Sequence, residues 1–253
     1  MRGPSAIRLR NAAYSTLAIL CMLLAWQLAG SSSALGMTVP PPAKVLAIFR
    51  QGTMLALLAR SAAATLSSAL GGLAAGTLLG TMTALAAHLV PLLRPGLDRL
   101  SVTLNAIPAI ALGPIFILMI GREMTPALLA TIPVFFIMYV AVRSGLRSTS
   151  VRLSQMLTTF GARQSRQLLY LDIPSALPAF LSGLKVSITA AMIGTIVGEW
   201  FGAPGGLGVV ILNTMQNFQI PLMWASVLLV AVLSLAGFGL LNLAERWAEW
   251  RFT

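Results

Sequence analysis

The stretch QMLTTFGARQSRQLLYLDIP, residues 155–174, lies in the longest connection between apolar runs. Apolar side chains at its start recur at i, i+3, i+4 and i+7, and they are Leu153, Met156, Leu157 and Phe160. This spacing predicts one stripe of an amphipathic helix, which Gly161 ends, and Pro174 is expected to stop a second helical turn. Such a helix-turn-helix fits either a groove on a partner or a lipid surface, and the pattern leaves both open.

Long apolar runs surround this stretch and dominate the composition. The 253 residues are 57% hydrophobic and only 9% charged, whereas soluble domains carry roughly 25% charged residues. Asp, Glu, Lys and Arg are absent from residues 11–43, 61–93, 100–121 and 124–142. This is the composition of a protein that crosses a lipid bilayer several times.

The apolar runs are long enough to span a bilayer, whose hydrocarbon core of about 30 Å needs about 20 helical residues. Six stretches qualify, and they lie near residues 12–30, 62–87, 102–120, 125–143, 179–199 and 223–244. We therefore expect an all-α polytopic membrane protein with six transmembrane helices.

Basic residues in the connections predict the orientation, because Lys and Arg are retained on the cytoplasmic side. With six spans both termini lie on one face, together with Arg94, Arg99, Arg143, Arg147, Arg152, Arg163 and Arg166. The opposite face holds only Lys44, Arg50, Arg60 and Arg122. Both termini are therefore expected in the cytoplasm.

The first span also resembles a secretory signal peptide, because arginines precede an apolar run that ends in small residues. The run is longer than a typical signal, so we expect an uncleaved helix. Pro40, Pro41 and Pro42 then stop any helix. Residues 45–58 read as a short amphipathic helix at the outer interface.

Three glycines in the second predicted span recur every four residues and share one helix face: Gly72, Gly76 and Gly80. Small residues at this spacing allow two membrane helices to approach closely. We interpret them as a packing surface with no chemistry attached.

Prolines interrupt two other spans, with Pro108 and Pro114 in the third and Pro133 in the fourth. A proline frees a backbone carbonyl, which in lipid must be satisfied by protein or by water in a cavity. Broken helices therefore tend to line a pathway, and Asn105 adds a polar amide before Pro108. A kink that serves only packing is the alternative, above all at Pro133.

Glu199 is the only acid that we place within or at the end of a span, which makes it a functional candidate. It would contact substrate, gate the outer mouth or cap the span, and it would repel an anionic substrate. The candidate residues of a translocation path are Asn105, Pro108, Glu199, Asn213 and Asn217.

The sequence lacks the residues that nucleotide-binding, metal-binding and catalytic sites require. No segment reads Gly-x4-Gly-Lys-Ser/Thr, and a single histidine supports neither a metal site nor a catalytic constellation. The net charge of +11 is scattered between apolar runs, so no nucleic acid is expected as a partner. A membrane protein of this kind could also be a self-sufficient channel or secondary transporter. That class predicts inverted repeats in the sequence and several buried acidic residues. We find no repeat and only one buried acid.

The connection that contains residues 155–174 resembles the EAA loop of binding-protein-dependent ABC importer permeases. The family pattern begins with Glu-Ala-Ala, followed by three residues and a glycine. An apolar residue and a proline then follow, with the proline thirteen positions after the glycine. Gly161 and Ile173-Pro174 have this spacing. Ala162 follows the glycine as is common in the family. Gln155-Met156-Leu157 replaces Glu-Ala-Ala, so the carboxylate for any salt bridge made there by relatives is missing, while the helix is still expected.

The resemblance extends over about residues 38–250. The stretches PPPAKVL (40–46), LLRPGLD (92–98), AIP (106–108) and GEWFGAPGGLG (198–208) are similar to the nitrate, sulfonate and taurine branch. That branch also includes permeases for thiamine-pyrimidine precursors. The sequence GEWFGAP at residues 198–204 favours a heteroaromatic precursor over a simple anion as the substrate.

The resemblance implies a type I ABC importer permease fold in a bacterial inner membrane. Residues 1–60 would hold the N-terminal tail, first span and outer segment, and residues 61–253 the core, with a cytoplasmic coupling loop at about 148–178. The implied partners are ABC ATPase subunits, which bind ATP and Mg²⁺, a second permease copy and an extracytoplasmic substrate-binding protein. No cofactor is implied in this chain. The coupling residues would be Gln155, Leu157, Phe160, Gly161, Ala162, Arg163, Arg166 and Pro174.

Overall fold

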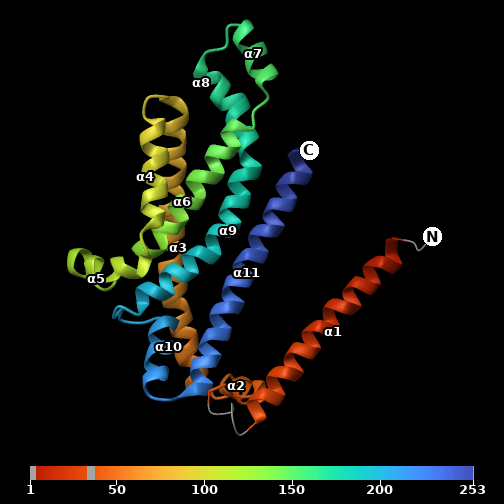
Figure 1. Cartoon of the computed structure of the whole chain (residues 1–253), viewed down its shortest axis with the longest axis vertical. Coiled ribbons are helices and arrows are strands. Elements are labelled where there is room, and N and C mark those ends of the chain that lie inside the picture. The colour runs from red at the N-terminus through yellow and green to blue at the C-terminus, as the bar shows by residue number, and fades with distance from the viewer. Residues whose placement is uncertain (1–3, 33–37, 253) are drawn as a thin grey trace. The chain divides into compact units, whose positions relative to one another are not determined.

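The computed structural model describes residues 4–32 and 38–252, and every regular element within these ranges is helical. The elements are α1 (Pro4–Ser31), α2 (Pro42–Ile48), α3 (Gly52–Leu89), α4 (Arg94–Ala106), α5 (Ala109–Ile120), α6 (Thr125–Arg147), α7 (Val151–Thr159), α8 (Gln164–Gln167), the π-helix η1 (Leu168–Asp172), α9 (Ile173–Glu199), α10 (Leu207–Gln216) and α11 (Ile220–Phe252) (Figure 1). The all-α prediction is confirmed.

Five helical stretches of the described chain are long and apolar enough to cross a membrane. They are Ala13–Ser31, Gly52–Leu89, Thr125–Arg147, Gln164–Glu199 and Ile220–Glu245. The pair α4 and α5 supplies the sixth if it crosses as one bent span. The six predicted apolar stretches therefore all correspond to helices.

The chain packs as two compact units. The first comprises Met1–Ala59 and Val210–Leu228. In it, the Trp26 and Trp224 rings lie 5.4 Å apart between centroids. The indole N–H of Trp26 donates to the Pro40 carbonyl and that of Trp224 to the Thr38 carbonyl, both at 3.1 Å. These bonds fasten the end of α1 and the start of α11 to the segment that precedes α2.

The second unit comprises Arg60–Val209 and Leu229–Thr253, and α6 lies at its centre beside α9 (Figure 1). Its buried core is made largely of small and aliphatic side chains, among them Ala84, Ala130, Val134, Met138, Val142 and Ala191. In lipid, helices associate through close packing rather than through the hydrophobic effect. Small side chains therefore suit this core.

The three glycines of α3 lie against one side of α6. A Cβ at Gly72 would lie 2.5 Å from the Ala130 Cβ, and one at Gly76 would lie 2.6 Å from Val134. A Cβ at Gly80 would lie 2.6 Å from the Phe135 carbonyl oxygen. The backbones of α3 and α6 can approach this closely only because side chains are absent here.

Glycines of α9 make the same kind of contact with α6. A Cβ at Gly194 would lie 2.6 Å from the Leu129 carbonyl oxygen, and one at Gly183 would lie 2.5 Å from the Ala141 Cβ. The helix α6 is therefore packed against α3 and α9 through positions that tolerate no added atom.

The third predicted span is bent rather than straight. The axes of α4 and α5 differ by 94° across Ile107 and Pro108. Ile107 is extended at φ −75° and ψ 122°, because a following proline disfavours the helical conformation. Pro114 lies inside α5 and Pro133 inside α6, and neither ends its helix.

The prediction of one interfacial helix over residues 45–58 is wrong. Pro42 starts α2, which ends at Ile48, and a turn precedes α3 at Gly52. Residues 52–58 are the first turns of a 38-residue helix that continues into the second span. The apolar periodicity of residues 45–58 came from two helices separated by a short turn.

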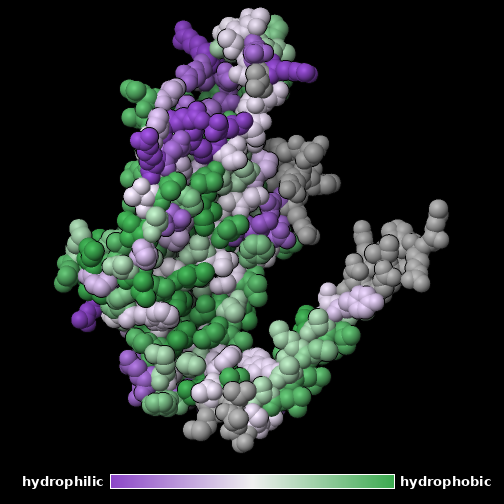
Figure 2. Space-filling model, in the orientation of Figure 1, coloured by the Kyte–Doolittle hydropathy of each residue, from purple (hydrophilic) through white to green (hydrophobic). Residues whose placement is uncertain are grey.

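Figure 2 shows hydrophilic side chains gathered over α7, α8 and the nearby end of α4. Apolar side chains cover the middle of the second unit in the same view. This distribution suits a unit whose middle meets lipid and whose α7–α8 end meets water.

The packing of α3 on α6 predicts opposite effects for two neighbouring glycines. Gly76→Ala should lower the melting temperature of the purified protein, because overpacking typically costs about 1–3 kcal/mol. Gly71→Ala should leave it unchanged or raise it, since a Cβ there meets only Ala127, at 3.9 Å. Thermal unfolding in detergent, followed by loss of the monodisperse peak, measures both. Equal melting temperatures for the two variants would contradict the packing.

Candidate functional site

The turn after α7 is built around Gly161, whose φ of +74° is a left-handed conformation that favours glycine. The Gly161 N–H donates to the Thr158 carbonyl at 3.0 Å, and the Ala162 N–H donates to the Leu157 carbonyl at 2.9 Å. These bonds satisfy the last carbonyls of α7. A Cβ at Gly161 would meet nothing within 4 Å, so its conformation, and not space, calls for glycine.

The outward face of α7 carries an apolar ridge, which we define as Leu153, Met156 and Phe160. Their exposed fractions are 48%, 53% and 77%. Leu157 is half-buried beneath the ridge, whereas Gln155 is exposed beside it. The surrounding exposed cations are Arg152, Arg163 and Arg166. No described residue covers the ridge.

Polar contacts fix this segment to the helix bundle. The side-chain amide of Gln167 donates to the Ser154 hydroxyl and joins α8 to α7. Asp172 is buried, and its Oδ2 lies 3.1 Å from Nε2 of His88 in the last turn of α3. A force on α7 would therefore reach α3 as well as α6 and α9.

Pro174 does not stop the chain, contrary to the expectation from sequence. Gln164 begins a helical path that continues through η1 into α9, and Pro174 lies in the first turn of α9. A proline lacks the N–H that would continue an α-helix. The π-helical turn on its N-terminal side shifts the bonding pattern there, so the path stays unbroken. The segment thus has a rigid connection to α9.

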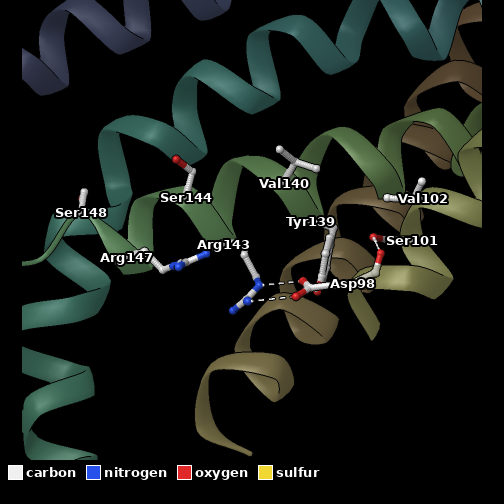
Figure 3. Close-up of a pocket in the computed structure, with 9 residues that line it drawn as sticks. All are labelled: Asp98, Ser101, Val102, Tyr139, Val140, Arg143, Ser144, Arg147 and Ser148. Atoms are coloured by element: carbon white, nitrogen blue, oxygen red, sulfur yellow. Dashed lines mark hydrogen bonds and ion pairs between the residues drawn. The ribbon is translucent and has the colours of Figure 1, made fainter. Parts of the chain in front are cut away.

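A second polar cluster joins α4 to α6 near the same end (Figure 3). Arg143 Nε donates to Asp98 Oδ1 at 3.0 Å, and its Nη2 donates to Asp98 Oδ2 at 3.3 Å. The Tyr139 hydroxyl also donates to Oδ1, at 2.6 Å. The Arg143 side chain is only 9% exposed, so Asp98 supplies the counter-charge that a buried guanidinium needs.

Glu199 lies at the far end of α9 and is buried. The Thr65 hydroxyl donates to Glu199 Oε1 at 2.8 Å, and the Gly208 N–H donates to Oε2 at 2.6 Å. The Leu207 N–H in turn donates to the Thr65 hydroxyl, also at 2.8 Å. These bonds tie α3, α9 and the start of α10 together. Burial in a structural contact removes the argument that Glu199 repels an anionic substrate.

The expectation of a single buried acid is wrong. Asp172 and Glu245 are buried as well, because each has a partner from a distant segment. Glu245 forms an ion pair with Lys185 and accepts a hydrogen bond from Ser182. Lys185 therefore pairs within the protein and does not reach for the membrane surface.

The other predicted path residues fall in two places. Asn105 and Pro108 are exposed at the break between α4 and α5. Asn213 and Asn217 are exposed at the end of α10, in the first unit, where the Asn217 amide donates to the Asn213 carbonyl at 2.8 Å. Their role in a translocation path stays a prediction.

Sequence reasoning missed the cluster of Asp98, Tyr139 and Arg143. A signal was present, since Tyr139 and Arg143 are polar residues four apart on one face of an apolar helix. Their partner was not visible, because Asp98 precedes Arg143 by 45 residues and counts for little in an orientation analysis.

Residues 76–250 match the family described as binding-protein-dependent transport system inner membrane component. The formylaminopyrimidine transport permease protein ThiX of Halalkalibacterium halodurans is 32% identical over 91% of this chain and 92% of its own length. The putative aliphatic sulfonates transport permease protein SsuC of Bacillus subtilis is 27% identical over 89% and 83%.

A solved structure shares the fold. A chain of the inward-facing MetNI methionine ABC transporter superposes with a TM-score of 0.65 at 18% sequence identity. The match covers 78% of this chain and 99% of the other. This chain therefore has the type I importer permease fold.

The cluster between α4 and α6 predicts coupled effects of two substitutions. Asp98→Asn and Arg143→Gln should each lower the melting temperature, because each leaves the other group without its partner. The double variant Asp98→Asn with Arg143→Gln should lower the melting temperature no more than either single variant does. The coupling energy between the two substitutions should be roughly 1–2 kcal/mol. Arg99→Gln, an exposed change on α4, serves as the control. Additive effects of the two substitutions would show that the pair contributes nothing.

Proposed function

Because this chain belongs to the family of binding-protein-dependent transport system inner membrane components, we propose that its α7–α8 segment receives the motion of a partner ATPase. The chain is the multi-pass inner-membrane permease subunit of an ABC importer, and it forms the path for a small solute. It is not itself an enzyme, since ATP hydrolysis belongs to the partner ATPase. The alternative of a self-sufficient channel or secondary transporter is set aside.

The observation that carries the proposal is the exposed apolar ridge of Leu153, Met156 and Phe160. An exposed aromatic and two aliphatic side chains at helical spacing suit a groove on a partner protein. The cations Arg152, Arg163 and Arg166 surround the ridge and would meet acidic groups at the rim of that groove. Gln155 and Ala162 complete the contacting face.

The proposal includes the direction of the chain across the membrane. The ATPase works in the cytoplasm, so α7 and α8 lie on that side, and both termini follow. The basic residues of this end support the same orientation, because Lys and Arg stay in the cytoplasm. ATP and Mg²⁺ bind on the partner, and this chain holds neither.

The second permease of the complex is proposed to be an identical copy. A path needs walls on two sides, and this chain supplies one bundle. The apolar side chains of α5 support the proposal, because Leu118 is 87% exposed and Met119 is 72% exposed. A second copy would cover them around a shared path.

The substrate is proposed to be a small heteroaromatic compound of the aminopyrimidine type. Support comes from the formylaminopyrimidine permease, which is 32% identical across most of both chains. The aliphatic sulfonate permease, at 27%, marks the competing class. The substrate-binding protein sets most of the selectivity, so the complete transporter is required for a test.

The ridge predicts that Phe160→Ala reduces recovery of the ATPase with the permease by about tenfold, because an anchoring aromatic is typically worth at least about 1.4 kcal/mol. Leu92→Ala is the matched control, since Leu92 is 88% exposed at the turn before α4 and lies outside the ridge. Co-purification from membranes measures both. The coupling proposal fails if the two variants retain the ATPase equally.

Uptake into cells that carry the complete transporter tests the substrate. Labelled formylaminopyrimidine should accumulate, and unlabelled taurine or methanesulfonate in excess should not compete. Accumulation of labelled taurine, with no accumulation of labelled formylaminopyrimidine, would assign the chain to the anion-transporting class.

A further inference from the structure

The groove between α4 and α6 holds about 650 Å³ and has a chemical character of its own (Figure 3). Val102 and Val140 form an apolar wall, and the Tyr139 ring adds to it. Arg143, Ser144 and Arg147 line the groove from α6. It lies near the hydrophilic end of the second unit, where water and lipid headgroups meet a membrane protein.

The two arginines place like charges one helical turn apart. Residues four apart on a helix are neighbours, and like charges at this spacing are destabilising. Figure 3 shows the Arg147 side chain directed along α6 toward Arg143. Asp98 is the one carboxylate among the residues that line the groove, and its contacts within the groove are with Arg143 and Tyr139.

The hydrogen bonds and ion pairs of Asp98 go to residues other than Arg147. Its Oδ1 accepts from Tyr139 at 2.6 Å and from Arg143 at 3.0 Å. Its Oδ2 accepts from Arg143 at 3.3 Å and lies 3.8 Å from Arg94 Nε. Among the described residues, Arg147 has no carboxylate partner, and the groove keeps an uncompensated positive charge.

We propose that this groove binds an oxyanion, with Arg147 as the direct contact. The planar guanidinium donates two parallel hydrogen bonds to a carboxylate, sulfonate or phosphate. Ser144 lines the groove three residues before Arg147, and its hydroxyl is a second hydrogen-bond donor. Val102 and Val140 would take up the apolar part of the ligand.

The ligand chemistry has two sources, a lipid phosphate headgroup or a small soluble anion. A bound oxyanion in either case would place a negative charge beside Arg147 and relieve its repulsion of Arg143. The site lies on α6, whose C-terminal end leads into α7. Occupancy would therefore stabilise the helix that connects the bundle to the ridge.

Binding to the permease purified with its ATPase, in phosphatidylcholine nanodiscs, tests the proposal. One arm titrates inorganic phosphate and, separately, methanesulfonate by calorimetry. The other arm exchanges fluorescent phosphatidylglycerol into the discs. We expect saturable binding in at least one arm, weakened about tenfold in Arg147→Gln, because the lost contact is a charge-assisted hydrogen bond. The affinity of Arg147→Lys should lie between that of the unchanged protein and that of Arg147→Gln.

Arg99→Gln is the matched control, because Arg99 is exposed on α4 and does not line the groove. Arg147 is also exposed, so Arg147→Gln should not lower the melting temperature, and relief of the repulsion of Arg143 should raise it slightly, if at all. Absence of saturable binding in both arms, or equal weakening by Arg99→Gln, would overturn the proposal. The assay requires no transport, so either outcome leaves the proposed role of the ridge unaffected.

Discussion

The close approach of α6 to α3 and α9 is the contact on which the rest of the molecule depends. Lipid offers no hydrophobic drive for helices to associate, so contact area and backbone proximity must hold them. Gly76 on α3 and Gly194 on α9 provide that proximity on two sides of one helix. Bulkier residues at these positions would separate the helices and lose the dispersion contacts along their length. The three helices therefore behave as one body.

This rigid body explains how a polar loop can act on a distant end of the molecule. The α7–α8 segment directly joins α6 to α9, and the His88 and Asp172 contact adds α3. At the opposite end of α9, about 40 Å away at 1.5 Å per residue, Glu199 binds α3 through Thr65. A displacement of the ridge is thus transmitted along helices clamped at both ends, as rigid-body transitions require.

Sequence reasoning found what depends on local pattern. Apolar length revealed the spans, the four-residue spacing of Gly72 and Gly76 revealed a common face, and Pro108 revealed a break. The 94° bend was not visible, because its size depends on what α5 packs against. Partners such as Asp98 for Arg143 lie far apart in the chain, and only the fold brings them together. The buried state of Glu199 likewise depends on Thr65, which is 134 residues away.

The central claim is that the apolar ridge on α7 contacts the partner ATPase. A photo-reactive benzoylphenylalanine at position 160 tests this most directly, with irradiation of intact membranes that contain the whole transporter. The account predicts a covalent adduct between the permease and the ATPase, formed from the cytoplasmic side. Adducts with lipid alone, or labelling of position 160 from the extracytoplasmic side, would contradict it.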